Sequence, residues 1–352
     1  MASKLLSRYP WASSPFIVGA PMRVMSGPKL ATAVSRAGGL GFIGPGAKTE
    51  DMNPDLEEAS TLLDTRRALS AFNSLSTYPL LPIGVGFQLW ADDMNVATTI
   101  IEKFKPCAAW LYAPREGAKD YEEWSRRIRQ ASPQTQIWIQ IGTLKEARQF
   151  LQCSEKPDVV VVQGAESGGH GRAKDGLGIM TLFPEVADAM AGSQIPLMAA
   201  GGIADSRGVA AALCLGASGV VMGTRFLASS EARINSGYQN EVVRASDGAV
   251  NTTRTLLYNH LRGTFGWPAE YSPRTIINKS FLDHQAGSSF EELQTLHDEA
   301  QKAGDNGWGP DGRLATYAGA AVGLIHSVQS AEDITRDARE DALKRIYQLG
   351  RL

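Results

Sequence analysis

Short runs of apolar residues recur along the first two thirds of the chain, with little alternation between apolar and polar positions. Strands that are buried on both faces, as in parallel sheets, have this pattern. It predicts strands at Phe16–Ala20, Leu40–Gly44, Pro82–Phe87, Cys107–Tyr112, Gln136–Ile141, Asp158–Gln163, Ile195–Ala200 and Gly219–Gly223.

Segments with apolar residues at helical spacing, such as Pro28–Ala37, separate these runs. Thr143 and Glu146 form a capping box that begins one helix, and Asp205 begins another that ends near Gly216. Strands that alternate with helices in this way predict an α/β fold of the (β/α)₈ TIM-barrel class. A doubly wound parallel sheet is the alternative, which the number and even spacing of the strands disfavour.

The alternation ends after Phe226, where Gly, Trp and Pro are scattered through a helical and loop-like region. Two helical patterns, Leu314–Gln329 and Ala331–Gln348, then close the chain. We predict a barrel at residues 1–229, a smaller and mostly helical lid subdomain at 230–313, and C-terminal helices that return to the barrel at 314–352.

Composition narrows the class of protein. The 352 residues include 35 Lys and Arg against 37 Asp and Glu, a net charge of −2 that argues against a nucleic-acid or anionic-membrane binder. No run reaches the roughly 18 apolar residues of a membrane span, and the N-terminus has no signal-peptide pattern. We expect a cytoplasmic protein whose cysteines, Cys107, Cys153 and Cys214, are buried free thiols.

One glycine cluster imitates a nucleotide-binding motif. Gly39, Gly41 and Gly44 fit the pattern GxGxxG. A dinucleotide fingerprint needs a strand, then the glycines, then a helix, whereas here a helix precedes the glycines and a strand follows them. We therefore interpret these glycines as a helix end and a tight turn into the second strand.

The predicted seventh and eighth strands both end in glycine, at Gly201-Gly202 and at Gly223-Thr224. In a barrel these are adjacent loops on the C-terminal face, where many barrels bind a phosphate through backbone amides. A Cβ would hold the phosphate oxygens away from these amides, and Thr224 adds a hydroxyl donor. Two ordinary glycine turns are the alternative.

A histidine stands among glycines after the sixth strand, which Gln163 ends; His170 follows Gly168-Gly169. A loop histidine is commonly a solvated residue, but at this face of a barrel an imidazole can serve as a general base. The first strand ends in Ala20-Pro21-Met22, which offers carbonyls and a flexible apolar side chain to the barrel mouth. The other histidines lack metal-ligand spacing, so we predict no metal site.

Together these stretches resemble the nitronate monooxygenases, formerly called 2-nitropropane dioxygenases. The resemblance is carried, in order, by Ala20–Met22, Ala37–Gly41, Gln163–Gly171, Thr181–Val186, Ala200–Ile203 and Met222–Thr224, and more faintly by Tyr317–Gly323. The chain departs from the family pattern at Gly86, where Asn is frequent, at Ser167, where Ala is frequent, and at Ala320, where Gln is common.

The resemblance implies an FMN-binding barrel that oxidises alkyl nitronates with O₂ to carbonyl compounds and nitrite, with nitroalkanes as a further candidate substrate class. It implies that His170 is the catalytic residue and that Gly201, Gly202, Gly223 and Thr224 hold the FMN phosphate. The remaining cofactor-binding residues would lie along the ring and ribityl chain: Ala20, Pro21, Met22, Gln163, Gly168 and Gly169. Besides FMN, the expected partners are the small-molecule substrate and O₂.

The histidine loop is also similar to that of the FMN-dependent enoyl-acyl-carrier-protein reductases. An NAD(P)H-dependent FMN reductase of an enoyl thioester or another activated alkene is therefore a second hypothesis. A phosphate-binding barrel without redox chemistry is the third.

Overall fold

The apolar runs predicted as strands close into a parallel barrel in the computed structural model, which describes residues 5–67 and 78–351. In order round the barrel, the strands are β1 (Ile17–Gly19), β2 (Leu40–Ile43), β3 (Leu81–Gln88), β4 (Pro106–Tyr112), β5 (Gln136–Ile141), β6 (Val159–Gln163), β8 (Leu197–Ala200) and β9 (Gly219–Met222). Val18 of β1 is in register with Leu40 of β2 on one side and with Val221 of β9 on the other. This closure confirms the barrel and makes the doubly wound alternative wrong, because that sheet has two free edges.

Aromatic side chains fill the middle of the barrel. Phe42, Trp110 and Trp138 pack together with ring centroids 5.2 to 5.9 Å apart. Below them, the N-terminal segment closes the barrel end where the strands begin: the Trp138 indole donates a 2.9 Å hydrogen bond to the Tyr9 hydroxyl, and Tyr9 stacks on Phe16. This packing stabilises the N-terminal end and leaves space for a ligand at the carboxyl ends of the strands.

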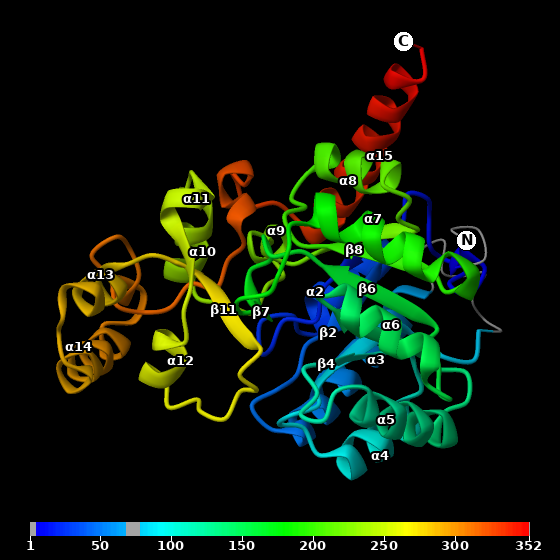
Figure 1. Ribbon diagram of the computed structural model, residues 1–352, viewed down its shortest axis with the longest axis horizontal. Coiled ribbons are helices and arrows are strands. Elements are labelled where there is room, and N and C mark those ends of the chain that lie inside the picture. The colour runs from blue at the N-terminus through cyan, green and yellow to red at the C-terminus, as the bar shows by residue number, and fades with distance from the viewer. Residues whose placement is uncertain (1–4, 68–77, 352) are drawn as a thin grey trace.

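Helices cover the outside of the barrel between the strands (Figure 1). They are α2 (Pro28–Arg36), α3 (Met52–Arg67), α4 (Met94–Phe104), α5 (Ala118–Ala131), α6 (Leu144–Gln152), α7 (Ile179–Met190) and α8 (Ser206–Cys214), with 3₁₀ turns η1 (Thr49–Asp51) and η3 (Ala191–Ser193). Both predicted helix starts are confirmed. The Thr143 hydroxyl accepts the Glu146 amide at 3.2 Å, and the Asp205 carboxylate caps α8.

Of the GxGxxG-like glycines, Gly39 lies between α2 and β2, Gly41 lies within β2, and Gly44 follows β2. A Cβ on Gly41 would be 2.1 Å from the Ala31 carbonyl oxygen, and one on Gly44 would be 2.2 Å from the Met22 carbonyl oxygen. These glycines let α2 and the segment after β1 pack closely on β2, which confirms the structural interpretation of the motif.

The last helix, α15 (Ala331–Leu349), packs against α8 and α2. Arg339 donates a 2.7 Å hydrogen bond to the Ala37 carbonyl at the end of α2, and Arg345 donates one of 3.1 Å to the Ser206 hydroxyl at the start of α8. The helix that directly follows β9, α9 (Thr224–Leu227), is short, and α15 takes the place of the eighth barrel helix.

The predicted helix at Leu314–Gln329 is wrong: the segment contains only a 3₁₀ turn, η5 (Ala320–Leu324). Its backbone pairs elsewhere, since the Thr316 carbonyl accepts the Ile276 amide and the Ala320 amide bonds the Glu166 carbonyl, both at 2.8 Å. A Cβ on Gly319 would lie 2.7 Å from that Glu166 oxygen. The small residues of this segment therefore allow close backbone packing and do not form a helix.

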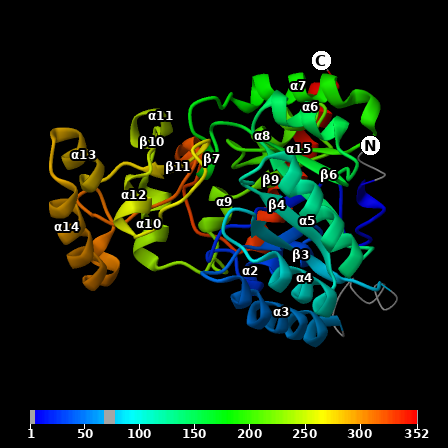
Figure 2. The ribbon, with the colours of Figure 1, turned by 60° about the horizontal axis from the view of Figure 1, so that its bottom comes forward.

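The lid, which we define as residues 230–330, combines helices with two strands that the sequence did not predict. Its helices are α10 (Ser236–Arg244), α11 (Gly248–Asn251), α12 (Leu257–Leu261), α13 (Lys279–Ala286) and α14 (Phe290–Lys302), with the 3₁₀ turn η4 (Gly304–Gly307). The missed strands, β10 (Thr252–Arg254) and β11 (Tyr271–Ile276), form an antiparallel sheet with β7 (Gly169–Arg172), which contains His170. Two views place the lid helices to one side of the barrel, with β7 and β11 between them (Figures 1 and 2).

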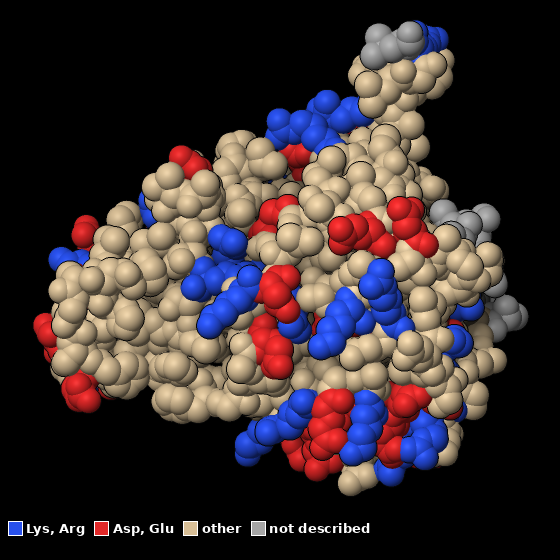
Figure 3. All heavy atoms as spheres, viewed as in Figure 1, with Lys and Arg blue, Asp and Glu red and all other residues tan. Residues whose placement is uncertain are grey.

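Charged side chains of both signs are interspersed on the face formed by α4 and α5 (Figure 3). Among the described residues, no helix combines the length and apolarity needed to cross a bilayer. The cysteines are free thiols, but only Cys107 is buried. Cys153 is half-buried and Cys214 is exposed, so the expectation of burial is wrong for these two.

Candidate active site

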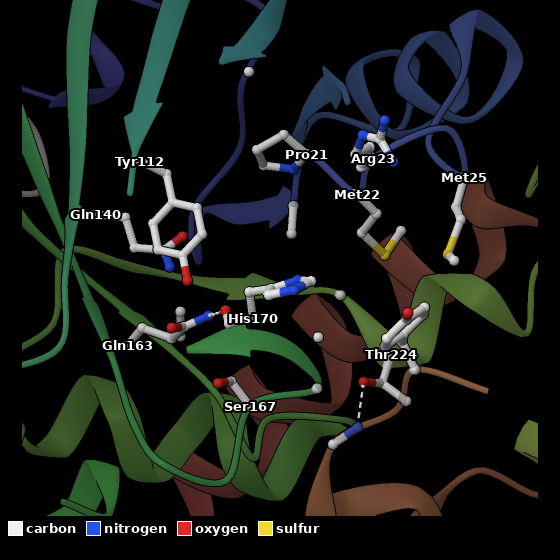
Figure 4. Close-up of a pocket in the computed structure, with 18 of the residues that line it drawn as sticks. Pro21, Met22, Arg23, Met25, Tyr112, Gln140, Gln163, Ser167, His170 and Thr224 are labelled. Atoms are coloured by element: carbon white, nitrogen blue, oxygen red, sulfur yellow. Dashed lines mark hydrogen bonds between the residues drawn. The ribbon is translucent and has the colours of Figure 1, made fainter. Parts of the chain in front are cut away.

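A cavity opens at the carboxyl ends of the barrel strands, between the barrel and the lid (Figure 4). It is lined by every residue that the sequence predicted for cofactor binding or catalysis: Ala20, Pro21, Met22, Gln163, Gly168, Gly169, His170, Gly201, Gly202, Gly223 and Thr224. The lid adds Asn259, Arg262, Trp267 and Tyr317 to the same lining. Figure 4 shows His170 in the middle of the cavity, with Gln163 on one side and Met22 and Thr224 on the other.

The glycines after β8 and β9 expose backbone amides to this cavity. Gly201 and Gly202 have φ angles of +92° and +75°, in the left-handed region that favours glycine. A Cβ on Gly201 would also lie 2.8 Å from the Gly164 carbonyl oxygen. Over residues 5–67 and 78–351, no acceptor is paired with the amides of Gly202, Gly223 or Thr224. These amides are available to donate hydrogen bonds to an anionic group.

Thr224 joins the barrel to the late glycine segment. Its hydroxyl oxygen accepts the Gly319 amide at 3.0 Å, which leaves the hydroxyl hydrogen available to a ligand (Figure 4). Gly319 packs directly on the histidine loop, because a Cβ on Gly168 would lie 2.4 Å from its nitrogen. The two glycines thus allow three chain segments to meet at one wall of the cavity.

His170 is held on both its face and its edge. Its ring lies parallel to that of Trp267, with centroids 3.5 Å apart and an interplanar angle of 6°. Its Nε2 is 2.8 Å from Nδ2 of Asn259, whose Oδ1 accepts a 3.0 Å hydrogen bond from the Tyr317 hydroxyl. The barrel supplies the backbone of the histidine, but the lid determines how its ring lies.

The environment keeps His170 neutral. Burial, together with the positive charges of Arg254, Arg23 and Arg262, lowers the pKa of His170 from 6.5 to about 3. A neutral imidazole carries one hydrogen and one lone pair, so each ring nitrogen has a distinct role at neutral pH.

Arg254 of β10 stabilises the histidine loop through hydrogen bonds to its backbone carbonyls. Its guanidinium donates hydrogen bonds to the carbonyls of Ala165 and Ser167, both at 3.1 Å, and to that of Gly169 at 3.2 Å. Burial lowers the pKa of Arg254 to about 10, so the side chain remains charged at neutral pH. On the barrel side, the Gln163 amide donates a 3.4 Å hydrogen bond to the His170 carbonyl.

Two buried polar atoms near the cavity have no protein partner among the described residues: the Tyr112 hydroxyl and the Trp90 indole nitrogen. Both side chains line the cavity. Burial raises the pKa of the Tyr112 hydroxyl far above its usual range, so it remains protonated. A buried polar group without a partner costs free energy, so these atoms suit a ligand that bonds to them.

The charged residues that line the cavity are arginines. Arg23 follows β1 and Arg262 follows α12, and no carboxylate from the described chain accompanies them in the lining. Burial and the charge of Arg262 both lower the pKa of Arg23, so the two cations influence each other. The cavity therefore presents a positive field to a ligand.

Gly86 provides space for a neighbouring residue. A Cβ at this position would lie 2.4 Å from Cβ of Pro21. The proline from the first strand end occupies the space that a side chain at position 86 would need. In this chain an Asn at position 86 would therefore require Pro21 to move.

The residues of the lining that the sequence did not indicate include Arg23, Trp90 and Tyr112 from the barrel and several lid residues. Tyr112 ends the fourth predicted strand, so the rule that identified Gln163 at a strand end would also have found it. Asn259, Arg262, Trp267 and Tyr317 lie outside the barrel repeat, and no spacing in the sequence marks them.

A family model and two relatives of high coverage show the family of this chain. The family model described as nitronate monooxygenase matches residues 10–77 and 120–265. The chain is 58% identical to nitronate monooxygenase npaC of Metarhizium robertsii, over 96% of this chain and 94% of the relative. It is 35% identical to a nitronate monooxygenase of Neurospora crassa, over 99% and 94%. Among solved structures it resembles FabK from Thermotoga maritima, with a TM-score of 0.72, 27% identity and 99% of each chain covered. The chain belongs to the nitronate monooxygenase family.

Proposed function

We propose that this chain is an FMN-dependent enzyme that oxidises alkyl nitronates with O₂ to carbonyl compounds and nitrite, with His170 in contact with the substrate. Family membership supports the reaction, and the arginine-lined cavity supports an anionic substrate. A nitronate is an anion, whereas a nitroalkane is neutral. The observation that carries the proposal is the pair Arg23 and Arg262 beside a neutral His170, without a carboxylate in the described lining.

The residues of the cavity fit FMN. The free amides of Gly202, Gly223 and Thr224, with the Thr224 hydroxyl, form a set of donors suited to a phosphate. Gly201 shapes this turn through its left-handed backbone. Ala20, Pro21, Met22, Gln163, Gly168 and Gly169 offer apolar surface and bare backbone for a flat ring and its ribityl chain.

When bound, FMN supplies the electron transfer between the nitronate and O₂. The chain's own residues bind and orient the substrate. Arg23 and Arg262 attract the anion and raise its local concentration, and the imidazole of His170 donates or accepts one hydrogen bond at the substrate. The Trp267 ring, stacked on that imidazole, covers one face of it and excludes water there.

The test is anaerobic reduction of the flavin, followed by absorbance, with a nitronate in one cuvette and NADH in another. We expect the nitronate to bleach the flavin and NADH to leave it yellow. Nitronate-dependent O₂ uptake should accompany this in air. Rapid bleaching by NADH without nitronate-dependent O₂ uptake would favour the reductase of an activated alkene. A colourless protein with no flavin in the denatured supernatant would reject both in favour of a non-redox barrel.

A further inference from the structure

The geometry points to Asn259 as a positioning residue. It holds His170 as the tautomer with hydrogen on Nδ1, so that the imidazole donates a hydrogen bond to the substrate and does not act as a base. The identity of the anion rests on the proposed function, but the tautomer does not. It follows from a chain of hydrogen bonds that runs through the lid.

This series of hydrogen bonds begins at an arginine, whose guanidinium can only donate. Nη1 of Arg262 donates to the Tyr317 hydroxyl oxygen at 3.4 Å, and the Tyr317 hydroxyl donates its own hydrogen to Oδ1 of Asn259 at 3.0 Å. Because an amide oxygen only accepts, the other end of the Asn259 amide is its NH₂ group. That group lies 2.8 Å from Nε2 of His170, which must accept.

Rotation of the imidazole by 180° about χ2 does not offer an alternative hydrogen-bonded arrangement. A half-turn of the ring would place a carbon opposite the Asn259 amide and lose the hydrogen bond. Trp267 fixes the plane of the ring, and β7 holds the backbone of His170 through its pairing with Pro273 of β11. In a neutral ring whose Nε2 accepts, the hydrogen is on Nδ1. No acceptor within the described chain is paired with that nitrogen.

Proton abstraction needs a free lone pair, and the only lone pair of this tautomer is engaged by Asn259. It also needs a partner for the imidazolium that would form. The charged groups that face His170 are Arg23 after β1, Arg254 of β10 and Arg262 after α12. The neighbouring hydroxyls of Tyr112 and Tyr317 stay protonated, because burial raises the pKa of each. The ring is thus built to donate to an anion such as a nitronate and not to deprotonate a neutral nitroalkane.

Asn259→Asp provides the direct test, because a carboxylate accepts where the amide donates. The matched control is Asn240→Asp, the same change at an exposed asparagine of α10. In the FMN-loaded protein, ¹⁵N NMR of the histidine rings should place the His170 hydrogen on Nδ1 in the parent and the control. In Asn259→Asp it should move to Nε2, and the pKa of His170 should rise into the range where histidine titrates.

Kinetics add a readout that a structural role would not change. In Asn259→Asp the imidazole donates its Nε2 hydrogen to the new carboxylate, so Nδ1 carries a free lone pair and can act as a base. We expect kcat/KM for a neutral nitroalkane to rise about ten-fold and to fall at low pH, where the new base becomes protonated. We expect kcat/KM for the nitronate to fall about ten-fold. A hydrogen on Nε2 in the parent protein, or an unchanged tautomer in Asn259→Asp, overturns the inference.

Tyr317→Phe tests the relay without placing a new charge in the cavity. Loss of the hydroxyl lets the Asn259 amide turn over, so the ¹⁵N spectrum should report a mixture of the two tautomers. A single Nδ1–H tautomer in this variant would contradict the relay. Failure of the proposed function is distinguishable, because absent nitronate-dependent O₂ uptake in the parent protein leaves the NMR result standing.

Discussion

The guanidinium of Arg254 in β10 donates a hydrogen bond of 3.2 Å to the carbonyl oxygen of Gly169, the residue before His170. A lid strand thereby supports the loop that carries the barrel's histidine. The same guanidinium also bonds the carbonyls of Ala165 and Ser167, so one side chain satisfies several buried acceptors. Stability and site geometry are coupled through this arginine.

Arg254→Met should destabilise the fold and the site together. The methionine retains apolar bulk but removes the Arg254 donors from the carbonyls of Ser167 and Gly169, whereas the Ala165 carbonyl keeps a hydrogen bond from Arg274. We expect the change to cost about 2 to 3 kcal/mol of unfolding free energy. Urea unfolding should report the loss, and nitronate turnover should fall with it. Arg207→Met, at an exposed arginine outside the cavity, is the control and should unfold as the parent does. An unchanged unfolding midpoint in Arg254→Met would show that the carbonyls find other donors.

His170→Asn should retain FMN while losing turnover. The His170 side chain lies at the centre of the cavity, whereas the proposed phosphate donors are backbone amides of other residues. Replacing the imidazole therefore leaves those donors in place. Loss of a hydrogen-bond donor at the reacting group lowers kcat/KM for the nitronate by roughly 100-fold. Flavin absorbance and O₂ uptake measure the two properties separately. His284→Asn, at an exposed histidine of α13, should change neither, and parent-like turnover in His170→Asn would remove this residue from the mechanism.

Gly201→Val should weaken FMN binding. The φ of Gly201 is +92°, and an added Cβ would lie 2.8 Å from the Gly164 carbonyl oxygen, so the turn must move. We expect the Kd for FMN to rise at least about ten-fold, measured by flavin fluorescence during titration of the apoprotein. Gly216→Val is a matched control, because Gly216 has a φ of +97° and no atom within 4 Å of an added Cβ. Equal FMN affinity in both variants would argue against the phosphate assignment.

The low pKa of His170 should make the fold sensitive to acid. The unfolded chain binds a proton at this residue below about pH 6.5, whereas the folded protein binds it only near pH 3. The unfolding free energy therefore falls as pH drops through this window, by about 1.4 kcal/mol for each pH unit. Urea unfolding at about pH 7 and about pH 5.5 should show a larger loss in the parent than in His170→Asn. Equal losses would mean that His170 titrates normally in the folded protein.

The barrel was predictable because its strands are buried on both faces. Runs such as Val159–Val162 consist entirely of apolar residues, as burial on both faces requires. Because all strands of a parallel barrel end at the same face, the glycines that follow the strands are expected to lie together there. The positions of His170, Gly201 and Gly223 after predicted strands likewise indicated the face of the barrel on which they lie. The prediction of strands failed where burial was absent from the local pattern, as in β10, whose Thr252–Arg254 is polar.

The sequence by itself determined the barrel, and it predicted a site at the ends of the strands with His170 in it. These depend on local periodicity and on the fixed geometry of parallel strands. Only the tertiary structure decided the state of that histidine. The lid brings Asn259, Trp267 and Tyr317 onto one imidazole, although they come from segments with no common pattern. The direction of a hydrogen bond and the charge of His170 depend on distances between such segments. The spacing of residues along the chain does not determine distances between segments that are far apart in the sequence.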